Sequence, residues 1–158
     1  MSRTLFHYTP VFSAVMILRE GLIRRSKVLR STDPPVYVWL SSNPRNEPMA
    51  CRVVSSREQT SAYLGRARFV FHGCDATPWA DLRLTRAVRR GLERLAEPKG
   101  GQPEEWFALP DDVPCRDLPL EIEMAGGWQE VVHDDFLLQY RGLKPPNVQR
   151  GGTSFFAA

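Results

Sequence analysis

Short β-prone runs and a few helix-prone runs follow one another in mixed order along this chain, and that order limits its fold more than any other feature. Strands are expected at 5–8, 36–40, 66–72, 105–109, 120–123 and 128–132, where β-branched and aromatic residues gather between turn residues. Helices are expected at 11–20 and 84–95, where apolar residues recur at helical spacing. About six strands with three or four helices in this order predict an α+β domain with a largely antiparallel or mixed sheet.

The first helix has signals at both of its ends. Thr9 and Pro10 are interpreted as its N-cap and first-turn proline. Gly21 stands where a left-handed residue would end it, and Leu22 is placed to pack back on Ile17 as in a Schellman motif. The opening of the chain is therefore predicted to be a strand, a tight turn, a helix and a stop.

The chain is expected to form one domain. Its 158 residues lie in the single-domain range, and 42% hydrophobic with 25% charged residues is typical of a folded globular protein. No internal repeat or linker divides it, so we place the domain at residues 1–143 and a loosely held tail at 144–158, where prolines and glycines are paired. One segment, 46–65, is ambiguous and is compatible with one or two short helices.

Composition also bears on compartment and metal content. No run approaches the roughly 18 apolar residues of a membrane span, and Met1–His7 lacks the apolar core of a secretory signal. A cytoplasmic protein without a membrane partner is therefore expected, or one delivered by a route that the sequence does not show. Cys51, Cys74 and Cys115 are an odd number without CxxC spacing, which argues against a disulfide framework and a four-ligand zinc site. His72 and Cys74 with Cys51 or Cys115 match no common zinc module, so no metal is expected. This metal site and a Cys–His nucleophile pair stay minor alternatives.

The charge balance hints at an anionic ligand. The net charge of +3 comes from 21 basic and 18 acidic residues, and arginine makes up most of the basic set. Its guanidinium suits bidentate contact with phosphate or carboxylate, although an ordinary solvated surface explains so small a bias more simply. The usual motifs of dinucleotide-binding, P-loop, serine-hydrolase and zinc-protease enzymes are absent from the sequence, so any activity must rest on a less rigid pattern.

One pattern distinguishes His7 from the other two histidines, although a lone histidine at a strand edge is usually structural. The run Leu5-Phe-His-Tyr-Thr, the helix end Ile17-Leu-Arg-Glu-Gly-Leu-Ile and the strand Val36-Tyr-Val-Trp-Leu-Ser-Ser occur in this order. Together they resemble the opening of the diphtheria-toxin-like ADP-ribosyltransferase superfamily, above all its compact branch with the tRNA 2′-phosphotransferases and the DNA-modifying DarT toxins. The resemblance covers residues 5–42 well and 66–114 loosely.

The resemblance implies an ADP-ribosyltransferase-like split sheet, mixed or antiparallel, flanked by three or four helices, with NAD as substrate. NAD presents two ribose diols, a pyrophosphate and a flat nicotinamide. Its site therefore needs hydrogen-bonding groups, an aromatic face and a charge opposite the developing oxocarbenium ion. By resemblance, His7 holds the adenine-side ribose and the Tyr8 backbone meets the carboxamide. Ser41 would support the nicotinamide ribose or the catalytic glutamate.

An aromatic face for the nicotinamide is expected from Tyr37, Trp39 or Tyr63, although a strand tryptophan more often belongs to the core. By resemblance, the complete NAD-binding set is His7, Tyr8, Thr9, Tyr37, Trp39, Ser41, Ser42 and Arg68.

This class of transferase also needs a carboxylate near the nicotinamide ribose, to fix its 2′-hydroxyl and to activate the incoming nucleophile. Glu105, with Glu104 beside it, opens an apolar run that leads to a Val-Pro pair, as in the family's late strand, and ranks first. Glu130, close to Trp128 on another expected strand, ranks second. The expected catalytic set is Glu105, Glu130 and His7, and the choice between the glutamates stays open.

Arginines are expected to hold the pyrophosphate or the target's phosphate. Arg68 opens the third expected strand, and Arg24, Arg25 and Arg45 follow the first helix and the second strand. The 2′-phosphotransferases use a set of arginines where the transferases use glutamate, and a full set does not align here. Transfer of ADP-ribose to a macromolecule is therefore favoured, and RNA 2′-phosphotransfer on the same fold stays open.

A third hypothesis is a non-catalytic binding or inhibitor module that uses the basic helix within 83–94 against nucleic acid or an acidic partner. For the enzyme, the expected partners are NAD and a macromolecular acceptor, which is protein, DNA or RNA. The enzyme is compatible with a toxin or effector, for which an antitoxin or immunity protein is a further candidate partner.

Overall fold

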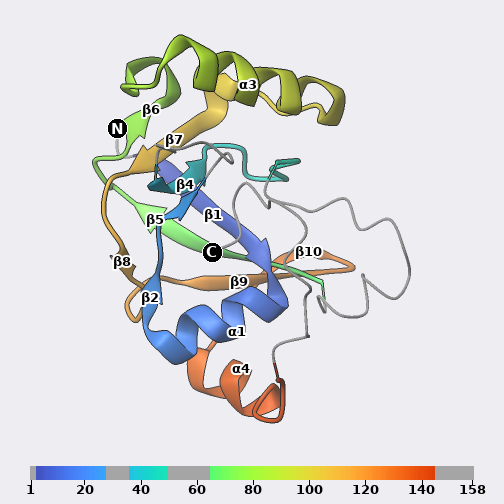
Figure 1. Cartoon of the computed structure of the whole chain (residues 1–158). Helices are drawn as coiled ribbons and strands as arrows, with labels where there is room; N and C mark the ends of the chain where they lie inside the picture. Colours follow the sequence, from blue (N-terminus) through green and yellow to red (C-terminus); the bar gives the residue numbers. More distant parts are fainter. Residues whose placement is uncertain (1–2, 28–35, 50–64, 145–158) are drawn as a thin grey trace.

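The computed structural model describes residues 3–27, 36–49 and 65–144, which form a central sheet with helices on both of its faces (Figure 1). The strands are β1 (Thr4–Pro10), β2 (Leu22–Ile23), β3 (Ser26–Lys27), β4 (Val36–Ser41), β5 (Arg66–His72), β6 (Thr77–Pro78), β7 (Trp106–Leu109), β8 (Val113–Pro114), β9 (Leu120–Met124) and β10 (Gly127–Val131). Within these residues the helices are α1 (Val11–Glu20), α3 (Arg86–Ala96) and α4 (His133–Gln139), with 3-10 turns η1 (Trp79–Asp81), η2 (Glu97–Lys99) and η3 (Pro103–Glu105). The predicted α+β class is confirmed.

β1 lies in the middle of the sheet. The strand order is β10-β9-β5-β1-β4-β7-β6, with β3 paired to β4 outside this path and β2 paired to β8 separately. β1 pairs with β5 from Thr4 opposite His72 to Pro10 opposite Arg66, and with β4 where Phe6 lies opposite Ser41. Every pairing in the described part of the chain is antiparallel, which agrees with the predicted sheet type.

The sheet has two buried faces, because successive side chains of a strand point to opposite sides. The face toward α1 and α4 buries, among others, Leu5, Val15, Val38, Leu40, Phe69, Phe107, Leu120 and Phe136. The face toward α3 and η1 buries, among others, Phe6, Tyr8, Trp39, Val70, Trp79, Leu92 and Trp106. Figure 1 shows α3 on one side of the sheet and both other helices on the opposite side. Neighbouring residues of β1 therefore belong to different layers.

The predicted N-cap of α1 is wrong, whereas its predicted end is confirmed. β1 continues through Thr9 to Pro10, which precedes the helix with extended backbone, and no side chain caps this end. The Val11 amide instead donates to the carbonyl of Gly65, just before β5, at 3.0 Å, which satisfies one of the four first amides that have no partner within the helix. At the other end Gly21 has φ 79°, and its amide donates to the Ile17 carbonyl at 2.8 Å.

The long elements lie close to their predicted positions, and the short ones are additional. α3 starts two residues after the predicted start, behind Thr85, whose hydroxyl accepts from the Val88 amide at 3.3 Å. α4 has no counterpart among the predicted helices, although Asp134 and Asp135 favour its N-terminus. Most of the ambiguous 46–65 segment and all but the first residue of the predicted tail lie outside the described residues. Among the described helices, none is long and apolar enough to cross a membrane.

Candidate active site at the end of strand β4

β4 ends at two serines, and the turn before β7 lies against this end. Ser41 lies opposite Trp106 in the pairing of β4 with β7, so Glu105, the last residue of η3, is placed beside Ser42. The Ser42 amide donates to the Glu105 carbonyl at 2.8 Å, and the Ser42 hydroxyl lies 3.4 Å from the same oxygen. Strand pairing thus brings together two predicted site segments that are far apart in the sequence.

The carboxylate of Glu105 is oriented by Asn43. The Asn43 Nδ2 donates to Glu105 Oε2 at 2.9 Å, and the Asn43 amide donates to Ser41 Oγ at 3.1 Å. The Glu105 side chain is half-buried. It is therefore fixed by the protein yet reachable by a ligand, as a general base or a sugar-binding carboxylate must be.

Glu47, in the loop after β4, joins the same group of residues and is only 1% exposed. Its Oε1 accepts from the Met49 amide at 3.1 Å, its Oε2 accepts from Trp106 Nε1 at 3.1 Å, and the Ser41 hydroxyl also bonds to it. Burial raises the pKa of Glu47, and the nearby charge of Glu105 raises it further. The hydrogen bonds to the carboxylate oppose this rise without cancelling it. Glu47 is not among the residues predicted from the sequence, because a glutamate in a polar loop is usually solvated.

Tyr8 connects β1 to this loop. Its hydroxyl donates to the Asn43 carbonyl at 2.6 Å and accepts from Arg68 Nη1 at 3.2 Å. Arg68 Nη1 also donates to the Pro44 carbonyl. We call Tyr8, Ser41, Ser42, Asn43, Glu47 and Glu105 the β4-end cluster; four of its six members are predicted site residues.

Arg68 contacts the cluster through Tyr8 and is 6% exposed. Its guanidinium carbon lies 4.1 Å from the ring centre of Phe6 and 4.4 Å from that of Trp128, so the group is stacked between two aromatic faces. Its Nε and Nη2 bond to the Glu121 carboxylate. All three nitrogens thus have protein partners, and the structure uses Arg68 to tie β5 to β9 and to the loop after β4.

His7 lies on the opposite face of β1 from Tyr8. Its ring is 2% exposed, and its centre is 6.4 Å from that of Phe69. Nδ1 donates to the Trp39 carbonyl at 2.9 Å, whereas Nε2 has no hydrogen-bond partner among the described residues, and nor has the buried hydroxyl of Thr9. Burial lowers the pKa of His7 to about 4, although the bond to Trp39 opposes this. The structure therefore does not bring His7 and Thr9 together with the β4-end cluster.

The buried His7 makes the stability of the fold depend on pH. An unfolded histidine binds a proton below about pH 6.5, whereas folded His7 does so only near pH 4, so unfolding takes up protons and stability falls as the pH falls. We expect this one group to lower the free energy of unfolding by about 2 kcal/mol between pH 7 and pH 5. Urea unfolding at both pH values measures the difference.

The matched comparison uses two variants. His7→Gln should shrink the loss between pH 7 and pH 5 by about 2 kcal/mol, and His72→Gln, which changes an exposed histidine, should leave it unchanged. The raised pKa of Glu47 acts in the opposite direction, but it cancels because all three proteins contain Glu47. Equal pH dependence in the native protein and His7→Gln would contradict the buried, neutral imidazole.

The predicted stacking residues lie on the α3 side of the sheet. Trp39 is 2% exposed, with its ring centre 5.6 Å from that of Tyr37 and 6.4 Å from that of Trp79, which in turn packs edge-on against Trp106. Trp39 is therefore part of the core, whereas Tyr37 is half-buried. The third candidate, Tyr63, lies outside the described residues.

The structure separates the two candidate carboxylates. Glu130 lies on β10 at the end of the sheet, is exposed, and stands opposite Glu121 in the β9–β10 pairing. Within the described part of the chain it forms no hydrogen bond or ion pair, unlike Glu105, which Asn43 holds. Only Glu105 belongs to the β4-end cluster.

Two of the predicted phosphate-binding arginines lie away from this cluster. Arg24 Nε donates to Glu20 Oε1 at 2.7 Å, and the Arg25 amide donates to Asp112 Oδ1 at 2.8 Å, beside the β2–β8 pair. Arg45 is closer, because its amide donates to the Asn43 side chain at 2.9 Å, and its own side chain is exposed. The described residues thus provide one exposed arginine next to the cluster.

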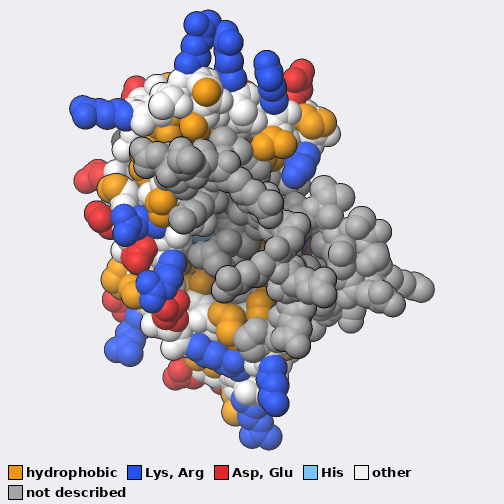
Figure 2. Space-filling model, in the orientation of Figure 1, with side chains coloured by type: hydrophobic (Ala, Val, Ile, Leu, Met, Phe, Trp, Pro, Cys, Tyr) orange, Lys and Arg blue, Asp and Glu red, His pale blue; other side chains and the backbone are white. Residues whose placement is uncertain are grey.

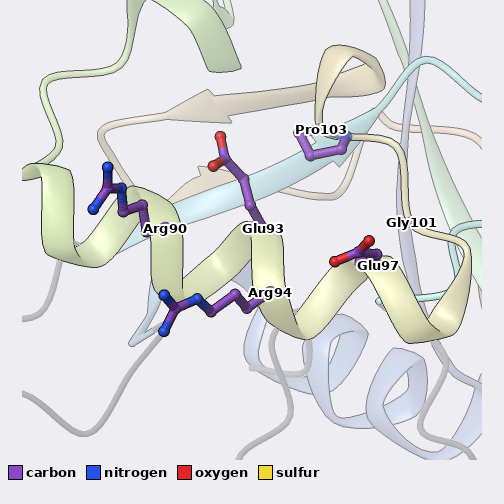
Figure 3. A pocket seen from close by; sticks show the side chains of 6 residues that line it. All are labelled: Arg90, Glu93, Arg94, Glu97, Gly101 and Pro103. Carbon is purple, nitrogen blue, oxygen red and sulfur yellow. The ribbon is translucent and has the colours of Figure 1, made fainter.

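A separate hollow of about 550 Å³ lies between α3 and the turn that leads to η3 (Figure 3). It is lined by Arg90, Glu93, Arg94, Glu97, Gly101 and Pro103. Pro103 is two residues from Glu105, so the hollow borders the site without containing any cluster residue. In residues 3–27, 36–49 and 65–144, no group of three or more His, Cys, Asp or Glu side chains is arranged to hold a metal ion.

Comparison with known proteins does not place the chain in a family. No protein-family model, curated protein or solved structure matches the chain. The functional assignment therefore rests on the residues of the site and on the sequence patterns described above.

Proposed function

We propose that this protein is an NAD-dependent ADP-ribosyltransferase with an ADP-ribosyltransferase-like fold, and that Glu105 is its catalytic carboxylate. The position of Glu105 supports this most strongly: the carboxylate is half-buried, held by Asn43 at 2.9 Å, and next to the serines that end β4. The family resemblance expects a glutamate and a small polar strand end to act together, and these two segments are adjacent here.

The proposed reaction transfers ADP-ribose from the nicotinamide of NAD to an acceptor atom. The bond between C1′ of the nicotinamide ribose and the nicotinamide nitrogen breaks, and nicotinamide leaves with the bonding electrons. A nucleophilic atom of the acceptor forms a bond to C1′ and gives its proton to a base. Glu105 has the chemistry to accept a hydrogen bond from the ribose 2′-hydroxyl, to offset the positive charge developing on the ribose and to take that proton.

The Glu47 carboxylate and the His7 imidazole act as positioning groups in this proposal. Glu47 bonds to Ser41 and Trp106, the paired ends of β4 and β7, and so holds together the two strands that place Glu105. His7 Nδ1 donates a hydrogen bond to the Trp39 carbonyl and so ties β1 to β4. Because its ring is buried on the other face, we assign His7 to positioning rather than to direct contact with a ribose.

The alternative reaction, RNA 2′-phosphotransfer, has less support. It requires several arginines at the phosphate, and Arg24 and Arg25 instead pair with Glu20 and Asp112. A glutamate at the centre of the site favours transfer of ADP-ribose.

Incubation with NAD labelled in the adenine ring tests the proposal. The purified protein is incubated with cell lysate, with DNA, with RNA and with 2′-phosphorylated RNA, and released nicotinamide and label fixed to macromolecules are both measured. Transferase activity gives equimolar nicotinamide and fixed label, and digestion with protease or nuclease then identifies the acceptor. Turnover that requires 2′-phosphorylated RNA would instead establish the phosphotransferase, and neither nicotinamide release nor fixed label would contradict both enzymes.

A further inference from the structure

The net positive charge of this protein comes from one segment of the chain. Residues 83–99 contain six basic and two acidic side chains, a net charge of +4, whereas the other 141 residues contain 15 basic and 16 acidic side chains, a net charge of −1. This segment comprises α3 and its two flanks. The whole basic excess of the chain therefore lies within a single surface element.

α3 is fixed to the domain by its inner side. Leu92 and Ala96 are 1% exposed and belong to the core beneath the helix. Arg89 is also used internally, because it donates to the carbonyls of Trp79 and Leu82, both at 2.9 Å, and stacks 4.8 Å from the Trp79 ring centre. The helix thus presents its outer side in a fixed orientation.

The remaining arginines of this segment are exposed. Arg83, Arg86, Arg90 and Arg94, which we call the α3 arginine stripe, form no hydrogen bond or ion pair with any described residue. Figure 2 shows Lys and Arg side chains projecting from the end of the molecule where α3 lies. By contrast, Arg24, Arg66 and Arg68 all pair with carboxylates. Among the described residues, the stripe is therefore a set of cations without a carboxylate partner.

The spacing of the stripe fits a regularly charged polymer. Arg86, Arg90 and Arg94 recur every four residues, about 6 Å apart along the helix, and span about 12 Å. One strand of a duplex presents three or four phosphates over that length, at about 3.4 Å each. Guanidinium groups bind phosphate oxygens in a bidentate manner, whereas ammonium groups act as point charges. An all-arginine stripe therefore suits phosphodiesters.

We propose that the α3 arginine stripe binds the phosphodiester backbone of a nucleic acid. The exposed side of α3 offers one large apolar side chain, Leu95, at 41% exposed, which is too little for the apolar centre of a stable protein interface. Glu93 points toward the hollow beside Pro103 (Figure 3), a hollow that Arg90 and Arg94 also line. The inference does not depend on the proposed transferase, because binding needs no NAD.

Fluorescence anisotropy without NAD tests the inference with short labelled duplex DNA, single-stranded DNA and RNA of one sequence. The logarithm of the binding constant should fall linearly with the logarithm of the salt concentration. For duplex DNA, Arg86→Gln/Arg90→Gln/Arg94→Gln should reduce that slope by about 0.9 for each phosphate that is no longer neutralised, and should weaken binding roughly tenfold or more. Comparison of the three probes shows which nucleic acid the surface prefers.

The control removes three exposed cations elsewhere, in Arg116→Gln/Arg141→Gln/Lys144→Gln, and so has the same net charge. It should retain native affinity and slope. Equal weakening in both triple variants, or displacement of the nucleic acid by polyglutamate at equal charge concentration, would overturn the inference. Native binding that is absent, or that does not change between about 50 and 200 mM salt, would overturn it whether or not the variants fold.

Discussion

Replacing Glu105 by glutamine is expected to reduce both nicotinamide release and label transfer by roughly 10²- to 10⁴-fold, the usual contribution of a positioned acid or base. The amide oxygen of glutamine still accepts the hydrogen bond from Asn43 Nδ2, so the geometry of the β4 end is retained. What is lost is the charge opposite the ribose and the base for the acceptor's proton. Initial rates with labelled NAD and the acceptor identified for the native protein measure the effect.

Two glutamates serve as matched controls. Glu104→Gln changes the exposed neighbour, and Glu130→Gln changes the competing candidate on β10, and both variants should keep native rates. Loss of activity in Glu130→Gln with full activity in Glu105→Gln would reject the site at the end of β4 while leaving the transferase itself intact. Inactivity of the native protein would reject the transferase, so the two failures are distinguishable.

Replacing Arg68 by methionine is expected to lower the free energy of unfolding by about 3 kcal/mol, at the low end for a broken buried ion pair because its partner is partly open to solvent. The substitution leaves the Glu121 carboxylate without its cation and removes a donor from the Tyr8 hydroxyl. It also ends the stacking of the guanidinium between Phe6 and Trp128. Urea unfolding at neutral pH measures the loss.

A double variant shows how much of that loss comes from the abandoned carboxylate. Arg68→Met/Glu121→Met should be more stable than Arg68→Met alone, because no uncompensated charge then remains on β9. Arg116→Met, at an exposed arginine, should change the free energy of unfolding by less than about 0.5 kcal/mol. A loss below about 1 kcal/mol in Arg68→Met would show that the network does not hold this part of the sheet.

Local patterns in the sequence predict most of the long helices and strands, but not the buried residues that position the site. The helix ends at Gly21 as predicted, because a left-handed stop is a property of adjacent residues. The segments of Ser41 and Glu105 are also recognisable, and antiparallel pairing of β4 with β7 makes them neighbours. These features are visible because each depends on a few consecutive residues.

The remaining features depend on contacts between distant residues. Glu47 is buried because Trp106 and Ser41 satisfy its oxygens, and nothing in its own loop shows that they will be there. The direction of the His7 side chain is equally hidden, since β1 is buried on both faces and alternation alone does not say which face is the functional one. α4 is too short for its pattern to stand out, although it packs with α1 in one core.

The central place of β1 has a consequence for how the protein folds during its synthesis. β1 is synthesised before the other described strands, but its longest partner, β5, ends only at His72. At about 5–20 residues per second, β1 is complete for roughly 3 to 12 seconds before β5 follows. The hydrogen bonds of Arg19 form later still, because their acceptors are the carbonyls of Tyr140 and Leu143. During that interval the strand has open edges that other nascent chains can pair with, so slow translation or chaperone loss should lower the soluble yield.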